Sequence, residues 1–327
     1  MTMQRDLSGI TPSGHLTLGN YLGALRRFVE RQHTVDGFYF VADLHALTTK
    51  HDPAKHRELT TSTAALFLAA GLDPQRATVF VQSDVPAHVQ LAYLLECTAH
   101  VGELSRMIQF KEKGGRPGTR ASLFTYPCLM AADILLYGAQ RVPVGGDQSQ
   151  HVELTRDLAV RFNTLYGPTF VVPELEPTAL TARVLDLQDP TRKMSKSDSD
   201  DAAGVVRLLD TPDVIRRKFR RAVTDSEGEV RYDPHAKPGV SNLLDILAAL
   251  TGQGPVSLAT TITSYGQLKD AVADAVIAEL RPLQERHDEL VADRPELARL
   301  LDIGRQRARE TSTPVLDQAQ QAMGITR

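Results

Sequence analysis

The pentapeptide KMSKS, residues 193–197, places two amines in a short polar run. Lys193 and Lys196 can reach two oxygens of one polyphosphate, and the hydroxyls of Ser195 and Ser197 can add hydrogen-bond donors. Amines that close on a diphosphate only as it departs bind the transition state better than the ground state, which raises the rate. A lysine-rich solvated loop is the alternative. The pattern favours phosphate chemistry.

A second candidate is TLGN at residues 17–20, which is preceded by ITPSG. Helix-terminal N–H groups and the helix dipole attract phosphate, Gly19 lets a flat base approach the backbone, and Asn20 can donate to a phosphate oxygen. Taken alone, TLGN is more typical of an ordinary helix cap with a glycine in its first turn. Neither GxGxxG nor a P-loop pattern occurs, so a dinucleotide fold or a P-loop has no support.

Asp133 is the third candidate, because it lies in LMAADILLY, a stretch whose other residues are nearly all apolar. An ionised carboxylate at such a position is unfavourable unless another group donates to it. A buried acceptor also lets a site reject ligands that lack the matching donor. The alternative places Asp133 on the wet edge of its helix, hydrogen-bonded to Tyr137 at i+4. The residues alone leave both interpretations open.

Short apolar runs predict the strands that position these residues. They are rich in aromatic or β-branched side chains, as strands buried on both faces of a parallel sheet should be. The two clear candidates are residues 38–42 (FYFVA) and 78–82 (TVFVQ), and weaker ones lie at residues 142–144 and 170–172.

Helical patterns separate these runs. Apolar residues recur at helical spacing over residues 18–29, and residues 64–70 indicate a helix that ends at Gly71. Beyond about residue 200 the strand-like runs disappear, and residues 243–250 indicate a helix that Ser241 could cap. The sequence therefore predicts an α/β fold with a parallel sheet, followed by a helical second part.

Bulk composition limits the class of protein. With 327 residues, 42% of them hydrophobic, the chain can form one large domain or two moderate ones. A formal net charge of −3 argues against non-specific coating of nucleic acid, so an RNA partner must meet local basic stretches. RRKFRR at residues 216–221 and RQRAR at residues 305–309 are such stretches, although a solvated helix face is the default for either.

Cysteine usage and the N-terminus indicate the compartment. Cys97 and Cys128 are too far apart for a CxxC pair, which argues against a disulfide framework, a zinc site or an iron–sulfur site. The start MTMQRDLSGI lacks the apolar core of a signal peptide, and no apolar run approaches the ~18 residues that span a bilayer. We expect a cytoplasmic protein with no membrane segment.

Together, TLGN and KMSKS resemble the signature pair of class I aminoacyl-tRNA synthetases, with TLGN in the place of HIGH and KMSKS matching letter for letter. Residues 124–159 (FTYPCLMAADILLYGAQRVPVGGDQSQHVELTRDLA) resemble the amino-acid pocket of the tryptophanyl-tRNA synthetase family of bacterial type. The similarity runs from SGITPSG through AVTDSEG at residues 222–228 to QAMG near the C-terminus. It therefore covers nearly the whole chain.

The resemblance implies a Rossmann-like catalytic domain over residues 1–200, with a dimer-forming insertion around residues 100–170. It implies an all-helical tRNA anticodon-binding domain over residues 201–327, whose last helix can pack back on the catalytic domain. It further implies L-tryptophan, ATP and tRNA(Trp) as substrates, Mg²⁺ bound through ATP without a dedicated protein metal site, and a homodimer.

The resemblance also implies site residues. Those expected at the reacting phosphates are Thr17, Asn20, Lys193 and Lys196. Those expected at ATP are Thr11, Pro12, Ser13, Gly19, Asn20, Lys113, Gly145, Gly146, Asp147, Val184, Lys193, Met194, Ser195, Lys196 and Ser197. Those expected at tryptophan are Leu7, Gly9, His45, Tyr126, Met130, Asp133 and Gln148, where an indole N–H is a suitable donor to Asp133.

Three positions depart from the family pattern. SGIQPSG is SGITPSG here, which puts Thr11 in place of a longer amide; Leu7 replaces a common aromatic residue, and the turn GEDQ is GGDQ, with Gly146. These changes affect the expected contacts more than the expected reaction.

The implied first step is attack of the tryptophan carboxylate on the α-phosphate of ATP. A free α-carboxyl group has a pKa of about 3.3–3.7, so it is ionised near neutrality and needs no general base. Catalysis then rests on alignment and on neutralising developing charge. Two alternatives stay open: a tyrosyl-tRNA synthetase, which shares both signatures, and a non-charging paralogue that binds tryptophan or RNA.

Overall fold

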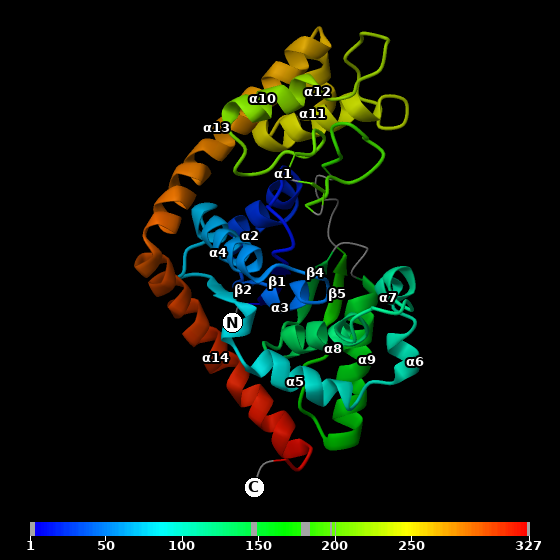
Figure 1. The fold of residues 1–327 in the computed structure, drawn as a ribbon, viewed down its shortest axis with the longest axis vertical. Helices are drawn as coiled ribbons and strands as arrows, with labels where there is room; N and C mark the ends of the chain where they lie inside the picture. Colours follow the sequence, from blue (N-terminus) through cyan, green and yellow to red (C-terminus); the bar gives the residue numbers. More distant parts are fainter. Residues whose placement is uncertain (1–3, 145–148, 178–183, 197, 200, 326–327) are drawn as a thin grey trace.

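The computed structural model describes residues 4–144, 149–177, 184–196, 198–199 and 201–325. Its centre is a five-stranded sheet in the order β3-β2-β1-β4-β5, in which every pair of neighbours is parallel (Figure 1). The strands are β1 (Arg5–Ile10), β2 (Asp36–Val41), β3 (Thr78–Val81), β4 (Arg141–Val144) and β5 (Glu174–Pro177). The predicted parallel α/β fold is confirmed.

Alternation along the strands divides the core into two layers, because successive side chains point to opposite faces of a sheet. Tyr39 and Val79 belong to one buried cluster, whereas Phe38, Phe40 and Phe80 belong to another. Every residue of β3 is buried, as expected for a strand covered on both faces.

Helices cover both faces of the sheet. The first cluster joins the helical run α1 (Leu18–Asn20), η1 (Tyr21–Leu25) and α2 (Arg26–Arg31) to α4 (Pro53–Ala69). The second joins α5 (Ala87–Glu96), α8 (Ser122–Leu135) and α9 (Ser149–Tyr166). Three short helices complete this half: α3 (Asp43–Ala46), α6 (Val101–Leu104) and α7 (Ile108–Lys113), with the 3₁₀ turn η2 (Gln82–Asp84) after β3.

The described residues beyond Pro177 contain helices and no strand that joins the sheet. They are α10 (Pro212–Arg220), α11 (Pro238–Thr251), α12 (Pro255–Thr261), α13 (Tyr265–Ala292) and α14 (Arg294–Ala322). Figure 1 shows α13 leaving this helical part alongside α4, and α14 continuing past the sheet to α5. A Cβ at Gly304 would lie 1.8 Å from the Val79 carbonyl oxygen, so α14 packs directly on β3 because residue 304 lacks a side chain.

Two local predictions are wrong. Residues 170–172 form no strand, because the Asn163 side chain accepts from the N–H groups of Thr169 and Phe170 and donates to the Phe170 carbonyl, occupying groups that a ladder would need. The fifth strand instead begins at Glu174. Ser241 does not cap α11, which begins at Pro238; its hydroxyl accepts from the Asp233 N–H at 2.9 Å.

The helix and strand predictions nearer the sheet are confirmed. Residues 38–42 and 78–82 correspond to β2 and β3, and residues 142–144 lie in β4. The helix over residues 64–70 belongs to α4, and Gly71 follows it with a φ of 108°. In the described part of the chain, no helix is long and apolar enough to cross a membrane.

Candidate active site

The predicted site residues gather at the carboxyl ends of the parallel strands. In the strand order the chain runs outward in one direction from β1 to β3 and in the other from β4 to β5, so the switch point lies between β1 and β4. Open α/β sheets bind ligands at this edge and at this point. Residues 11–20 leave β1 here, and residues 42–45 leave β2 beside them.

Thr17 and Asn20 cap the helical run that follows β1. The Thr17 hydroxyl accepts from the Asn20 N–H at 3.3 Å, and Asn20 Oδ1 accepts from the Thr17 N–H at 3.0 Å and from its hydroxyl at 3.1 Å. The ordinary-cap interpretation of TLGN is thus confirmed. Because Oδ1 is engaged, the Nδ2 donors of Asn20 are the part of the amide that suits another acceptor, such as a phosphate oxygen.

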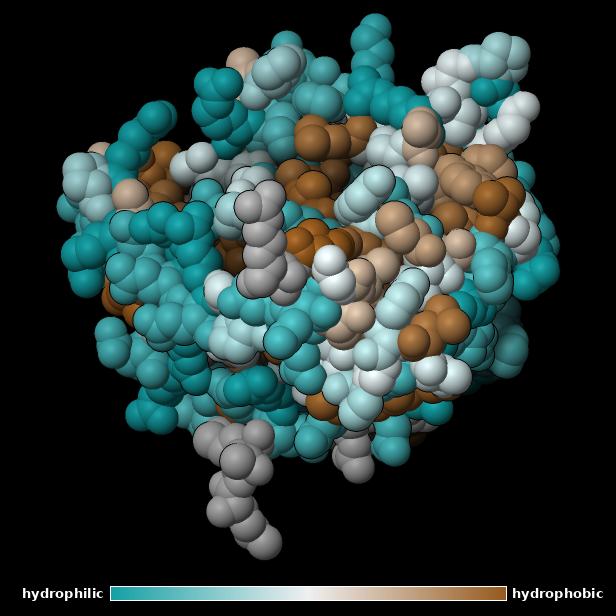
Figure 2. All heavy atoms as spheres, turned by 90° about the horizontal axis from the view of Figure 1, so that it is seen from below, coloured by the Kyte–Doolittle hydropathy of each residue, from teal (hydrophilic) through white to brown (hydrophobic). Residues whose placement is uncertain are grey.

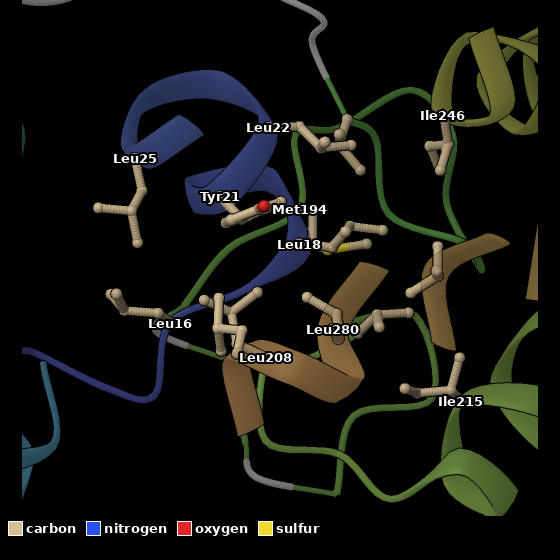
Figure 3. Packing of buried hydrophobic residues seen from close by; sticks show 14 of the residues in the cluster. Leu16, Leu18, Tyr21, Leu22, Leu25, Met194, Leu208, Ile215, Ile246 and Leu280 are labelled. Atoms are coloured by element: carbon tan, nitrogen blue, oxygen red, sulfur yellow. The ribbon is translucent and has the colours of Figure 1, made fainter. Parts of the chain in front are cut away.

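The two signature segments meet at Gly19 and Met194. A Cβ at Gly19 would lie 3.6 Å from Val184 Cβ and 3.8 Å from Met194 Cβ. Met194 is 3% exposed and packs in the same cluster as Leu18, beside which Figure 3 shows it. The Met194 N–H also donates to the Val184 carbonyl at 3.1 Å. The methionine therefore anchors KMSKS against the start of the capped helix.

Lys196 faces the segment that follows β1. Its ammonium group donates to the Thr11 carbonyl at 2.5 Å, and a Cβ at Gly14 would lie 2.2 Å from the Lys196 carbonyl oxygen. Burial, together with the neighbouring charge of Lys193, lowers the pKa of Lys196 to about 8. Lys193 is exposed, Ser195 is half-buried, Pro12 is buried and Ser13 is exposed.

Arg207 joins the region after KMSKS to the region before TLGN. Its guanidinium donates to the His15 carbonyl at 3.0 Å, to the Asp198 carbonyl at 2.8 Å and to the Ser199 carbonyl at 3.0 Å. The backbone forms an isolated antiparallel bridge between Thr17 and Arg207, in which the Leu18 N–H donates to the Val206 carbonyl at 2.8 Å. Both signatures are thereby held to the same short segment.

Asp133 in α8 is buried, with 2% of its surface exposed, and three side chains donate to it. Oδ1 accepts from Gln82 Nε2 at 2.8 Å and from His88 Nδ1 at 2.6 Å, while Oδ2 accepts from His45 Nε2 at 2.8 Å. Burial alone raises the pKa of this carboxyl, but the bonds from His45 and His88 outweigh it, and the pKa lies below its ordinary value. The wet-edge interpretation is therefore wrong.

The expected hydrogen bond between Asp133 and Tyr137 at i+4 does not form either. His88 lies between the two residues, and its Nε2 is 2.8 Å from the Tyr137 hydroxyl. His88 is fully buried and packs against the rings of Phe40 and Phe80, which offer no acceptor for its Nδ1 hydrogen. Asp133 is therefore its acceptor. The carboxylate and the phenol are linked through this imidazole.

Tyr126 and Met130 lie near Asp133 on the same helix. The Tyr126 hydroxyl is 2.5 Å from Nε2 of the buried His151, and its ring packs edge-on to His45 with centroids 6.2 Å apart. Burial raises the pKa of Tyr126 to about 12. Met130 is partly buried against the second core cluster. The structure thus brings His45, Tyr126, Met130 and Asp133 together.

Three other predicted residues are placed less directly. Leu7 is 4% exposed and packs in the second core cluster, and a Cβ at Gly9 would lie 2.7 Å from the Phe40 ring, which fills that space. Lys113 is exposed in the last turn of α7. The predictions for Gly145, Gly146, Asp147, Gln148 and Ser197 lie outside the described residues.

The sequence analysis missed Gln82, His88 and Arg207. Gln82 and His88 follow β3 in the segment QSDVPAH, and polar residues directly after a buried strand were a usable signal. Arg207 bonds backbone carbonyls, which carry no residue-type signal. Among the described residues, no group of three His, Cys, Asp or Glu side chains could hold a metal ion.

The arrangement combines an anion-binding helix start, two amines and a buried carboxylate along one edge of a parallel sheet. It suits the binding of a nucleoside polyphosphate beside a small ligand that carries a hydrogen-bond donor. The two amines and the helix start can align a polyphosphate and neutralise its charge, which are the means of catalysis that this arrangement offers.

Comparison with known proteins gives consistent matches. Residues 4–281 match the family described as tRNA synthetases class I (W and Y). A tryptophan--tRNA ligase 1 of Streptomyces avermitilis is 55% identical over 329 residues, which cover 99% of each chain. The crystal structure of a tryptophanyl-tRNA synthetase from Mycoplasma pneumoniae has a TM-score of 0.89 and 38% identity, covering 99% of this chain and 98% of that one. A Campylobacter jejuni tryptophanyl-tRNA synthetase complexed with ADP and tryptophan has a TM-score of 0.85 and 32% identity, covering 98% of this chain and 100% of that one.

Proposed function

The chain belongs to the class I tRNA synthetases for tryptophan and tyrosine, and from this premise we propose that it is a tryptophan--tRNA ligase. It activates L-tryptophan with ATP, forming tryptophanyl-adenylate and diphosphate, and then transfers the aminoacyl group to tRNA(Trp). The observation that carries the choice of amino acid is the buried carboxylate of Asp133, which can only accept hydrogen bonds when ionised. An indole N–H can only donate, so the two groups are matched.

Tyrosine is the nearest competitor, because its hydroxyl can also donate to a carboxylate. The relatives and structures compared above are named for tryptophan, which supports the indole as ligand. In this proposal Asp133 accepts the indole N–H, and Met130 and His45 lie along the ring. Tyr126 and Gln148 hold the ammonium group, and Leu7 and Gly9 close the pocket on the sheet side.

The phosphate side carries the first step. The tryptophan carboxylate is already ionised near neutrality, so it attacks the α-phosphate without a general base. Lys193 and Lys196 neutralise the charge that builds on the departing diphosphate, and the helix start at Thr17 and Asn20 holds the other phosphate oxygens. Mg²⁺, bound through ATP, supplies further positive charge there.

The other predicted ATP residues surround the rest of the nucleotide in this proposal. Val184, Met194 and Gly19 border the adenine and ribose, together with Gly145, Gly146 and Asp147. Ser195, Ser197 and Lys113 add donors near the triphosphate, and Thr11, Pro12 and Ser13 form the segment that follows β1. Gly19 supports this placement, because nothing larger than a hydrogen atom projects from it toward Val184 and Met194.

We assign residues 1–200 to catalysis and residues 201–327 to recognition of the tRNA anticodon. The basic run on α10 is partly neutralised within the protein, because Arg216 lies 3.1 Å from Asp274 and Arg220 lies 3.6 Å from Asp270. Arg217 and Arg221 are exposed, and they are the members of this run that we expect to meet phosphates.

A homodimer is the proposed assembly. Large apolar side chains are exposed on α5, α6 and α9, where a monomer would leave them in water: Val89 (54%), Tyr93 (66%), Val101 (71%), Val160 (51%) and Leu165 (61%). Figure 2 shows apolar residues grouped among hydrophilic ones on the end of the molecule that bears α5 and α9. Exposed apolar clusters of this kind mark association surfaces. We propose the cytoplasm as the compartment, because tRNA is charged there.

The test is ATP–diphosphate exchange with each of the twenty amino acids, followed by charging of tRNA(Trp). We expect exchange with tryptophan and at least ~100-fold less with tyrosine. The chain contains no tryptophan, so the fluorescence of bound L-tryptophan reports binding without background from protein tryptophan when tyrosine is not excited. Exchange with tyrosine instead would contradict the assignment, and binding of tryptophan without any exchange would indicate a non-charging paralogue.

A further inference from the structure

The buried carboxylate of Asp133 stands at the end of a chain of side chains that reaches the C-terminal helix. His88 links Asp133 to Tyr137, and the Tyr137 hydroxyl is hydrogen-bonded in turn to the side chain of Ser312 in α14. All four residues are buried, and Ser312 is fully so. Three elements, α5, α8 and α14, therefore contribute to one hydrogen-bonded chain.

The direction of the hydrogen bonds along this chain can be assigned. An ionised carboxylate only accepts, so Nδ1 of His88 carries the hydrogen that faces Asp133 Oδ1. Burial raises the pKa of Tyr137 well above its ordinary value, so its hydroxyl stays protonated and donates to Nε2 of His88. The Ser312 hydroxyl, which also donates to the Arg309 carbonyl at 3.4 Å, closes the far end of the chain. The hydrogens of His88 and Tyr137 both point toward the carboxylate, and aligned hydrogen bonds of this kind strengthen one another.

The hydrogen bonds to Asp133 leave room for one more donor, as a count of its acceptor positions shows. A carboxylate offers about four lone-pair positions, two on each oxygen. Gln82 and His88 occupy both positions on Oδ1, and His45 occupies one on Oδ2. One position on Oδ2 is therefore left for a ligand. His45 is the member of this set on the open side, because 14% of its side chain is exposed whereas His88 has none exposed.

We propose that His88 is a specificity-determining positioning residue: with Tyr137 and Ser312 behind it, it occupies Oδ1 of Asp133 and thereby orients Oδ2 toward the N–H of the amino-acid side chain. This inference rests on the proposed function and assigns the residue that sets its selectivity. Loss of the His88 donor leaves the buried carboxylate one hydrogen bond short, so Asp133 protonates more readily and its oxygens can reorient. A protonated carboxyl donates, and then meets the indole N–H with a hydrogen of its own.

The test uses a matched pair of substitutions at His88. His88→Asn keeps a donor near the Nδ1 position, whereas His88→Leu has a similar volume and no donor. Selectivity is the ratio of kcat/KM in ATP–diphosphate exchange for tryptophan and for its benzothiophene analogue, in which sulfur replaces the indole N–H. We expect His88→Leu to lower this ratio by about tenfold or more, and His88→Asn to retain it within about threefold.

Tyr137→Phe tests the chain behind His88 and serves if His88→Leu does not fold. It removes one hydroxyl and keeps the ring between Phe38 and Phe80, so we expect a smaller fall in the ratio, of about threefold. Tyr265→Phe is its control, because that hydroxyl also donates to a carboxylate, Asp225 at 2.5 Å, in the helical part of the chain. The control should leave the ratio unchanged.

A pH profile separates positioning from mere packing. The titratable groups that face Asp133 are His45 from α3, His88 from α5 and, through His88, Tyr137 from the turn that follows α8. Because removal of a donor raises the pKa of Asp133, the acid limb of kcat/KM for tryptophan should move to higher pH in His88→Leu and stay in place in His88→Asn. Equal losses for tryptophan and the analogue, with an unmoved acid limb, would overturn the inference.

The two proposals fail in different ways. A wild-type protein that shows no exchange with tryptophan overturns the function and, with it, the premise of this inference. A wild-type protein that discriminates against the analogue, with variants that discriminate equally well, overturns only the role of His88.

Discussion

On the amino-acid side of the site, Asp133 receives hydrogen bonds from the side chains of three residues on three different segments, whereas on the phosphate side Lys196 donates to a backbone carbonyl. We call the first set, His45, Gln82, His88 and Asp133, the carboxylate cluster. We call the second, Thr11, Thr17, Asn20 and Lys196, the phosphate edge. In the carboxylate cluster Gln82, His88 and Asp133 are buried and one carboxylate oxygen is saturated, whereas in the phosphate edge Thr11, Asn20 and Lys196 are half-buried and Thr17 alone is buried.

The difference matches what each side must do. Selection of a side chain needs an acceptor that cannot move, because a loose one would also accept water or a wrong ligand. Neutralisation of a departing diphosphate needs cations that can exchange a protein partner for a phosphate oxygen as charge builds. The Thr11 carbonyl is a neutral partner for Lys196 and is easily exchanged in this way, whereas a carboxylate partner would compete with the phosphate.

The largest effect should come from the phosphate edge. Replacing Lys193 and Lys196 together by Met removes both amines, and we expect the rate of ATP–diphosphate exchange to fall by more than about 100-fold. Binding of L-tryptophan, followed by its own fluorescence, should change little, because neither amine contacts the carboxylate cluster. Lys50→Met, at an exposed position between α3 and α4, is the control. Exchange at the wild-type rate would refute the assignment of KMSKS.

The second effect concerns the carboxylate cluster. Asp133→Asn keeps the shape but replaces one accepting oxygen by an NH₂ group, which must face a donor from His45 or from Gln82 and His88. We expect tryptophan to bind about 10- to 100-fold more weakly, the range for loss of a hydrogen bond to a charged group. Affinity for ATP, measured by equilibrium dialysis, should stay within about threefold of wild type. Unchanged tryptophan affinity would place the ligand elsewhere.

The third effect concerns Arg207, which should alter the phosphate side of the site and not the amino-acid side. Arg207 contacts neither proposed ligand but holds the His15 carbonyl to those of Asp198 and Ser199. Arg207→Met should lower kcat for exchange by about tenfold, because small misplacements of reacting groups cost up to ~100-fold, and should leave tryptophan affinity unchanged. Arg161→Met is the control, since Arg161 also donates to a backbone carbonyl, that of Thr98, away from the site. An equal loss in both variants would show that Arg207 acts through stability alone.

These residues also show how far the sequence could lead. KMSKS and TLGN are contiguous, and Asp133 is conspicuous in an apolar helix, so each could be singled out from its neighbours. The pairing of Gln82 and His88 with Asp133 could not, because these residues lie 51 and 45 positions away and meet it only once β3 and α8 are packed; their place directly after a buried strand was the one local signal. Likewise, the apolar run at residues 170–172 resembles a strand until the Asn163 amide takes its backbone groups. Local pattern found the contiguous chemistry, and tertiary packing decided the rest.

The smallest effect is a pH dependence of the phosphate edge. Because burial and the charge of Lys193 lower the pKa of Lys196 to about 8, this amine loses its proton as pH rises through that value in the free enzyme. We expect kcat/KM for ATP, which reports the free enzyme, to fall on a basic limb near pH 8. Lys196→Arg keeps the charge at higher pH, so the limb should move upward, whereas Lys50→Arg should leave it in place.

The lowered pKa of Lys196 also makes the free energy of unfolding depend on pH. Between the folded pKa of about 8 and the ordinary value of 10.5, the unfolded chain binds more protons at this lysine than the folded chain does. The contribution of Lys196 to the free energy of unfolding therefore rises with pH across this window. The free energy of unfolding of wild type and of Lys196→Met, from denaturant titrations, should differ in slope against pH in that window and run parallel below it. Parallel curves throughout would mean that Lys196 is not held in the half-buried position that distinguishes it from the exposed Lys193.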